Sequence, residues 1–241
     1  MNGMFYSCSK LKTAKDLTVS SFSGKKNCNQ MFEGCIQLEN APALPAMKVT
    51  ESCYQDMFKN CQNLRIVPNL PATTVDVDCY TCMFQSCTNL EQGPMELPAE
   101  TLRDRCYTSM FYGCSSLTKA PKLSAKTMAH KCYEYMFAYC KNIKEADISA
   151  ENVAIFCFHE MFNGCSNLKE VTIYVNDFDK NQYGYAPNEY MPDLVFYPFE
   201  GWLNGTAETG TVHIRSGLTE TTKEAIYLPN SNWTFVEDVT D

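Results

Sequence analysis

Cys53-Tyr54-Gln55-Asp56-Met57-Phe58-Lys59-Asn60-Cys61-Gln62-Asn63-Leu64 is one copy of a block that organises most of the chain. The pattern Cys-Tyr-x-x-Met-Phe-x-x-Cys-x-x-Leu occurs six times with small variations, at steps of 25 to 27 residues. A partial earlier copy contains Met4, Phe5, Cys8 and Leu11, so we expect the chain to begin inside a repeat. Because similar units stacked in register bury apolar faces that one unit leaves open, the pattern predicts a solenoid. The first cysteines of the six full copies are Cys28, Cys53, Cys79, Cys106, Cys132 and Cys157.

The spacing inside each block predicts one helix and one short strand. Val49, Cys53, Met57 and Cys61 are four residues apart, which favours a helix of about three turns with one apolar side. The leucine that ends the block, a second apolar residue and a Leu-Pro-Ala segment then indicate an extended stretch. A proline removes a hydrogen-bond donor from a sheet, so we expect short strands and an imperfect sheet. The prolines of these stretches are Pro42, Pro68, Pro94 and Pro121.

The repeat resembles those of a known family. Cys-Tyr-x-x-Met-Phe-x-Gly-Cys-x-x-Leu followed by Ala-Pro-x-Leu-Pro-Ala is similar to the BspA-like leucine-rich repeats of bacterial surface proteins, over about residues 1–173. The resemblance implies an α/β repeat fold, a right-handed leucine-rich-repeat solenoid of about seven repeats of 25 to 27 residues.

Residues 174–241 depart from the repeat period and predict a small C-terminal capping module, which would cover the apolar edge of the last repeat. This part also resembles the closing segment of the family, in 201–205, 209–212, 228–229 and 232–234. Alternation of apolar and polar residues predicts strands at 211–215 and 233–237. The tyrosine-rich stretch 179–192 is polar and predicts an exposed loop.

Composition limits the classes of partner. The chain has 241 residues, of which 45% are hydrophobic, and its 28 acidic and 20 basic residues give a net charge of −8. A negative field repels nucleic-acid phosphates and anionic lipids, so nucleic acid is not expected as a partner. No apolar run approaches the roughly 20 residues that cross a bilayer, so direct membrane insertion is not expected either. The N-terminal residues lack the apolar stretch of a signal peptide.

Fourteen cysteines are the most unusual feature of the composition. Thirteen occupy two fixed positions of the repeat, where buried free thiols acting as small apolar side chains are expected. Cys79 and Cys82 form a Cys-x-x-Cys pair without a second pair to complete four metal ligands. His159 begins a His-Glu-x-x-His motif, but the second position is Asn163. We therefore predict no metal site, no cofactor and no catalytic residues, and hence no enzyme.

Tyrosines offer the strongest candidates for binding. Tyrosines at variable repeat positions are expected to cluster on the surface, and aromatic clusters suit contacts with protein or sugar. The candidate partner-binding surface consists of Tyr112, Tyr135, Tyr139, Tyr183, Tyr185 and Tyr190. Other variable positions are expected to form an extended surface, namely Arg65, Ile66, Glu91, Gln92, Thr118, Lys119, Lys144, Glu145, Lys169 and Glu170.

The resemblance implies an extracellular or cell-surface protein of a host-associated bacterium. The expected function is non-catalytic binding or adhesion, with a host matrix protein or surface glycan as partner. The open N-terminal repeat also predicts self-association through that end. An alternative is a structural spacer or stalk, on a cell surface or in a phage tail, without a ligand of its own. A carbohydrate-active enzyme is a third class, but it needs paired carboxylates in one cleft.

Overall fold

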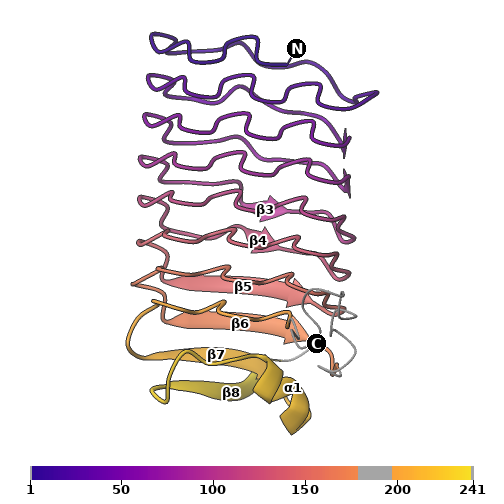
Figure 1. Cartoon of the computed structure of the whole chain (residues 1–241), viewed down its shortest axis with the longest axis vertical. Coiled ribbons are helices and arrows are strands. Elements are labelled where there is room, and N and C mark those ends of the chain that lie inside the picture. The colour runs from indigo at the N-terminus through magenta and orange to yellow at the C-terminus, as the bar shows by residue number, and fades with distance from the viewer. Residues whose placement is uncertain (1, 179–196, 240–241) are drawn as a thin grey trace, which may run out of the picture.

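The repeats stack as a parallel β-solenoid in the computed structural model, which describes residues 2–178 and 197–239 (Figure 1). Each block forms part of one coil, and successive coils lie side by side along the long axis. All strand pairs are parallel; β1 and β2 form a two-stranded sheet, and β3 to β8 form a six-stranded sheet in chain order. The strands are β1 (Lys48–Val49), β2 (Thr74–Val75), β3 (Glu96–Leu97), β4 (Lys122–Leu123), β5 (Glu145–Ala150), β6 (Glu170–Val175), β7 (Gly210–Arg215) and β8 (Trp233–Val239).

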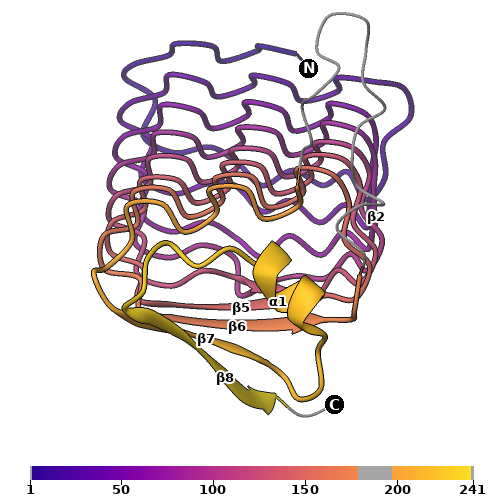
Figure 2. The same ribbon diagram turned by 60° about the horizontal axis from the view of Figure 1, so that its bottom comes forward.

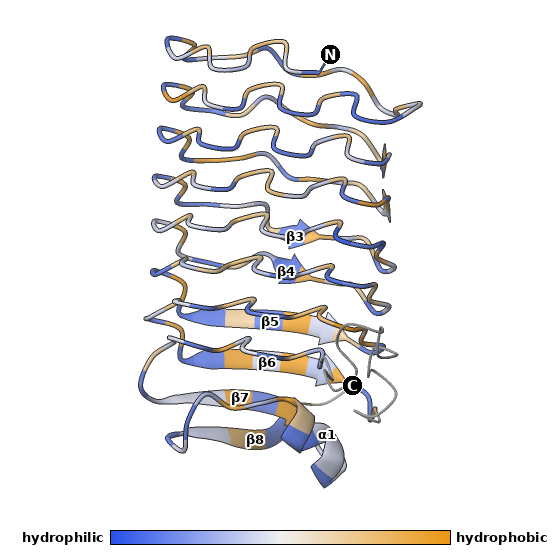
Figure 3. Ribbon diagram, in the orientation of Figure 1, coloured by the Kyte–Doolittle hydropathy of each residue, from blue (hydrophilic) through white to orange (hydrophobic). Residues whose placement is uncertain are grey.

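Proline content separates the short strands from the long ones, as the sequence predicts. The four coils that carry prolines have strands of two residues, β1 to β4. Each of these prolines is the fourth residue after the leucine that ends the block. In the next two coils this fourth residue is Asp147 or Thr172, and their strands β5 and β6 have six residues each. Exposed and buried residues alternate along β5 and β6, which is visible as alternating colours in Figure 3.

The predicted repeat helices are wrong. In each block every second backbone N–H group donates to the carbonyl oxygen three residues earlier, within a tight turn. The N–H groups between them donate to carbonyl oxygens of the next coil. Thus Met57 N donates to Tyr54 O at 3.2 Å, whereas Phe58 N donates to Met83 O at 2.9 Å. Asp56 and Asn60, four residues apart, have φ of 54° and 61°, which a right-handed helix excludes. The four-residue spacing of the apolar side chains therefore reflects consecutive turns of four residues each. Val49 lies in β1 and not in a helix.

The only helix in the described part of the chain is α1 (Glu220–Ala225), outside the repeats. Thr219 caps it by accepting a hydrogen bond from Thr222 N. Figure 2 shows α1 lying over the C-terminal end of the stack. The predicted strands at 211–215 and 233–237 are confirmed as parts of β7 and β8.

The sheet continues without a break into the C-terminal region. The expected boundary after residue 173 falls inside β6, and β7 pairs with β6 in register, Val171 opposite Val212. The stacked turns of the blocks continue as well, because Phe162 N donates to Trp202 O and Gly164 N to Asn204 O, both at 2.8 Å. Residues 198–205 thus form another coil of the stack. A capping module with its own boundary, and the handedness of the stack, stay predictions.

Ladders of identical side chains form the core. The phenylalanines of the blocks are fully buried and stack at ring-centroid separations of 5.4 to 5.6 Å. The tyrosines of the Cys-Tyr pairs form a second ladder, and the hydroxyls of Tyr54 and Tyr133 are buried without a hydrogen-bond partner among the described residues. The phenylalanine ladder consists of Phe32, Phe58, Phe84, Phe111, Phe137 and Phe162.

All fourteen cysteines are free thiols in the structure, and twelve of them are buried. The second cysteine of each full block points at the preceding coil: Cys61 Sγ donates to Phe32 O and Cys87 Sγ to Phe58 O, both at 3.1 Å. Burial raises the pKa of Cys132 to about 12, so this thiol stays protonated and unreactive at neutral pH. The ladder cysteines therefore act as core side chains.

Candidate recognition surfaces

The stack has two broad sides with different chemistry. The turn side carries the Cys-Tyr-x-x-Met-Phe blocks, and the strand side carries β3 to β8 (Figure 2). Buried side chains separate the two, since the apolar residues of the blocks and of the strands belong to one core cluster. Each side therefore has to be considered as a separate surface.

On the turn side, the structure brings two of the predicted tyrosines together. The rings of Tyr112 and Tyr139 meet edge to face, with centroids 5.3 Å apart and an interplanar angle of 69°. Tyr139 also lies against the backbone of the next coil, where a Cβ added to Gly164 would be 2.7 Å from its Cδ1. The Tyr139 side chain is nevertheless 44% exposed. We call Tyr112 and Tyr139 the tyrosine platform.

Tyr135 lies outside this contact. Its ring packs edge to face on His159, with centroids 5.3 Å apart. The loop tyrosines Tyr183, Tyr185 and Tyr190 lie outside the described residues. The six predicted tyrosines are therefore a platform of two, a neighbour that contacts a histidine, and three that the structure leaves untested.

Beside Tyr135 lies a buried charge cluster that sequence reasoning missed. Glu134 is only 8% exposed, and its Oε1 is 2.9 Å from Lys131 Nζ and 3.4 Å from His159 Nδ1. Burial favours the neutral carboxyl, but the contacts with His159 and Lys131 prevail and hold the pKa of Glu134 below its ordinary value. Lys131 Nζ also lies 5.2 Å from the centre of the Phe156 ring. Glu134 thus lies between Lys131 and His159, and the ring of Tyr135 packs on the same histidine.

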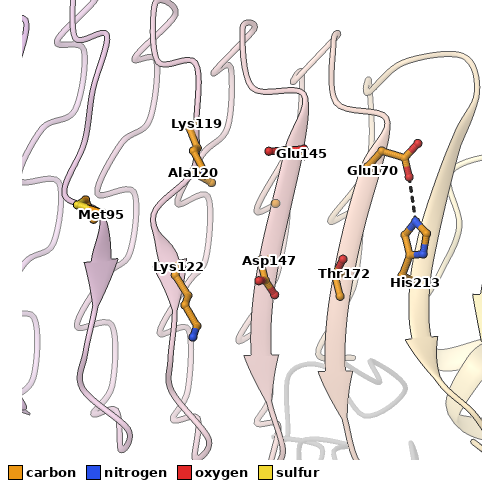
Figure 4. Close-up of a pocket in the computed structure, with 10 residues that line it drawn as sticks. Met95, Lys119, Ala120, Lys122, Glu145, Asp147, Glu170, Thr172 and His213 are labelled. Atoms are coloured by element: carbon orange, nitrogen blue, oxygen red, sulfur yellow. Dashed lines mark hydrogen bonds and ion pairs between the residues drawn. The ribbon is translucent and has the colours of Figure 1, made fainter. Parts of the chain in front are cut away.

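The strand side carries a hollow of about 490 Å³ that spans the strands from β3 to β7 (Figure 4). Met95, the most exposed large apolar side chain of the described residues at 82%, lines this hollow and two neighbouring ones of about 320 and 310 Å³. An exposed thioether at the junction of three hollows suits contact with a macromolecule. The other residues that line the main hollow are Lys119, Ala120, Lys122, Glu145, Ala146, Asp147, Glu170, Thr172 and His213.

Charges of opposite sign follow one another across these strands. Lys119 and Lys122 belong to the coil of β4, and Glu145 and Asp147 belong to β5 (Figure 4). All four are exposed, and none makes an ion pair or side-chain hydrogen bond with another described residue. Elsewhere neighbouring coils do pair their charges, as Arg105 and Asp78 do at 2.8 Å. The four charges of the hollow thus remain available to a partner.

His213 on β7 ties the last three strands together. Its Nε2 is 3.0 Å from Glu170 Oε2 on β6, and its Nδ1 is 2.9 Å from Asp238 Oδ1 on β8. The hydrogen bonds with Glu170 and Asp238 raise the pKa of His213 above its ordinary value, because both favour the charged imidazolium. Sequence reasoning did not assign this role, since the three residues are far apart in the chain.

The variable positions predicted to form an extended surface do lie on the surface of the stack. All ten of its variable residues are exposed, and they align across neighbouring coils. Ile66 bridges to Gln92, Glu145 pairs with Glu170, and Arg65 Nη1 lies 3.5 Å from Glu91 Oε1. The alignment follows from the common repeat length, which returns each position to the same side of the stack.

The described residues contain no cluster of three or more histidine, cysteine or acidic side chains placed to hold a metal ion. Cys82 is partly buried, and burial raises its pKa to about 11, so the Cys79 and Cys82 pair does not present a reactive thiolate at neutral pH. No helix in the described part of the chain has the length and apolar character needed to span a membrane.

Two family models match the chain. The model described as BspA type leucine rich repeat region matches residues 84–185 in six copies. The model described as Mycoplasma protein of unknown function, DUF285, matches residues 1–124, about half of the chain. No curated protein matches the chain, and no solved structure matches it either. The two matches together place the chain in the BspA-like leucine-rich-repeat family, and the resemblance seen in the sequence is confirmed.

Proposed function

We propose that this protein is a non-catalytic recognition module of a bacterial cell surface that binds a protein or a glycan through its tyrosine platform. One observation carries the proposal: the half-exposed ring of Tyr139 is fixed between Tyr112 and the backbone at Gly164. An aromatic ring held in this way loses little conformational entropy when a ligand packs on it, which is the property of an anchor residue.

The location at a cell surface rests on membership of the BspA-like family. The binding role rests on the regular stack, since one rigid core holds variable side chains in fixed rows on its outer faces. Tyr135 adjoins the platform, and the loop tyrosines Tyr183, Tyr185 and Tyr190 belong to the same proposal. A structural spacer would need the stack alone and no fixed, exposed aromatic rings.

The proposal is tested by screening the protein on an array of extracellular-matrix proteins and glycans. Tyr139→Ala is then compared with the wild type for each hit. We expect a loss of affinity of about thirtyfold, because truncating an aromatic anchor costs about 2 kcal/mol. Tyr6→Ala is the matched control, since Tyr6 is 55% exposed and lies on a different coil.

Equal loss in the Tyr6 and Tyr139 variants, or no loss in either, would show that the platform is not the binding site. Circular dichroism checks that both variants keep the stack. If the wild-type protein binds nothing on the array, the spacer function replaces the binding function.

A further inference from the structure

The charges in the strand-side hollow form two levels along the strands. Leu123 pairs with Ile148, which places Lys122 level with Asp147 on the neighbouring strand. One level further back, Lys119 corresponds to Glu145, since each precedes a buried alanine, Ala120 or Ala146. At both levels a lysine on the coil of β4 thus lies beside a carboxylate on the neighbouring strand β5.

This arrangement is complementary to itself. We propose that the strand side binds a second copy of this chain, related by a two-fold axis that runs parallel to the strands between β4 and β5. The rotation places β4 of one copy over β5 of the other and keeps each residue at its level along the strand. Lys119 then faces Glu145 of the second copy, and Lys122 faces Asp147. Because the contact is isologous, each ion pair forms twice.

The neighbouring strands agree with the same rotation. It brings β3 over β6, where Glu96 faces Thr172 and the exposed Met95 lies close to that strand. Glu170 faces Gln92, an uncharged side chain on the coil of β3. No like charges oppose each other among these residues. A two-fold axis along the stack would instead place each strand over its own copy, lysines near lysines and carboxylates near carboxylates, which is unfavourable.

The size of the face limits the area that the contact can bury. Five coils about 4.8 Å apart, each contributing a stretch about as long as β5 or β6, give a contact that buries on the order of 1,000 Å² in total. This lies at the lower end of specific interfaces, so the dimer is weak and depends on concentration. The tyrosine platforms lie on the opposite sides of the two copies and stay accessible, which makes the dimer bivalent.

Sedimentation velocity on the full 241-residue chain tests the proposal with a charge-swap design. The Lys119→Glu, Lys122→Glu double variant has carboxylates at all four of these positions, and the Glu145→Lys, Asp147→Lys double variant has lysines at all four. We expect the wild type to dimerise at low salt, each double variant to self-associate at least tenfold more weakly, and an equimolar mixture of the two variants to dimerise. Raising NaCl to about 0.5 M weakens the wild-type dimer, because salt screens the ion pairs.

The Lys10→Glu, Lys12→Glu variant is the matched control. It changes the net charge equally, and both lysines are exposed on the first coil. We expect it to dimerise like the wild type. A monomeric wild type at the highest concentration, a mixture that fails to associate, or double variants that associate like the wild type would each overturn the proposal. Association that ignores both charge reversal and salt would point to the N-terminal edge instead. Ligand binding on the array is measured separately, so the two proposals fail independently.

Discussion

Gly210, the first residue of β7, is the position where a single added methyl group has the clearest predicted effect. A Cβ at this residue would lie 2.5 Å from Cζ2 and 2.6 Å from Cη2 of Trp233, and 2.7 Å from the carbonyl oxygen of Lys169. Trp233 is 2% exposed, and its indole donates to Ala207 O at 2.9 Å. The indole must therefore move by about 1 Å, and the carbonyl oxygen of Lys169, just before β6, restricts where the methyl group can go.

Two costs add up in Gly210→Ala. Overpacking of a tight core costs about 1 to 3 kcal/mol, and loss of the indole hydrogen bond costs about 1 kcal/mol more. The free energy of unfolding should thus fall by about 2 to 4 kcal/mol. For a chain of this size each kcal/mol lowers Tm by about 2 to 4 °C if the chain unfolds as one unit. In a solenoid the effect can also remain local, so hydrogen exchange in 210–239 should rise before exchange in the first coils.

Calorimetry and hydrogen exchange measure both quantities, and Gly93→Ala is the control. A Cβ at Gly93 would be no closer than 3.6 Å to any neighbour outside its own chain segment, which is ordinary contact. Its stability should stay within about 1 kcal/mol of the wild type. Equal Tm values for Gly210→Ala and Gly93→Ala would refute the close packing of Trp233 against β7.

Three further predictions concern the core and the C-terminal strands. Phe84→Ala should destabilise the chain by about 3 to 5 kcal/mol in chemical denaturation, because this fully buried ring is stacked between Phe58 and Phe111 at 5.6 and 5.4 Å. Titration of thiols after denaturation without reductant should detect all 14 cysteines, and a value near half would show that the ladders are bridged. Because the folded pKa of His213 is raised, its stabilisation is complete below the ordinary histidine pKa and is lost as pH rises through the folded value. Tm should therefore fall as pH rises above the ordinary histidine pKa of about 6.5, and His213→Gln should flatten this dependence.

The candidate surfaces were only partly predictable. The exposure of the variable positions followed from the repeat alone, since a fixed repeat length returns each position to one side. The contact of Tyr112 with Tyr139 was foreseen as a cluster, but its support by the backbone at Gly164 was not. The pairing of His213 with Glu170 and Asp238 joins residues up to 43 positions apart, and no local pattern indicates it.

By itself the sequence determined the stack, the repeat length, the buried ladders and the effect of proline on strand length. These properties depend on the period and on residue type, which are visible along the chain. It did not determine the backbone conformation of the blocks. A spacing of four apolar residues fits a helix, and it fits equally well a series of turns with a left-handed residue every fourth position. The glycine before the second cysteine, as at Gly34, Gly113 and Gly164, was the local signal for turns, but the other copies replace it. The choice was made by the tertiary structure, because half of the backbone N–H groups in each block find their acceptors about 26 residues away, on the next coil.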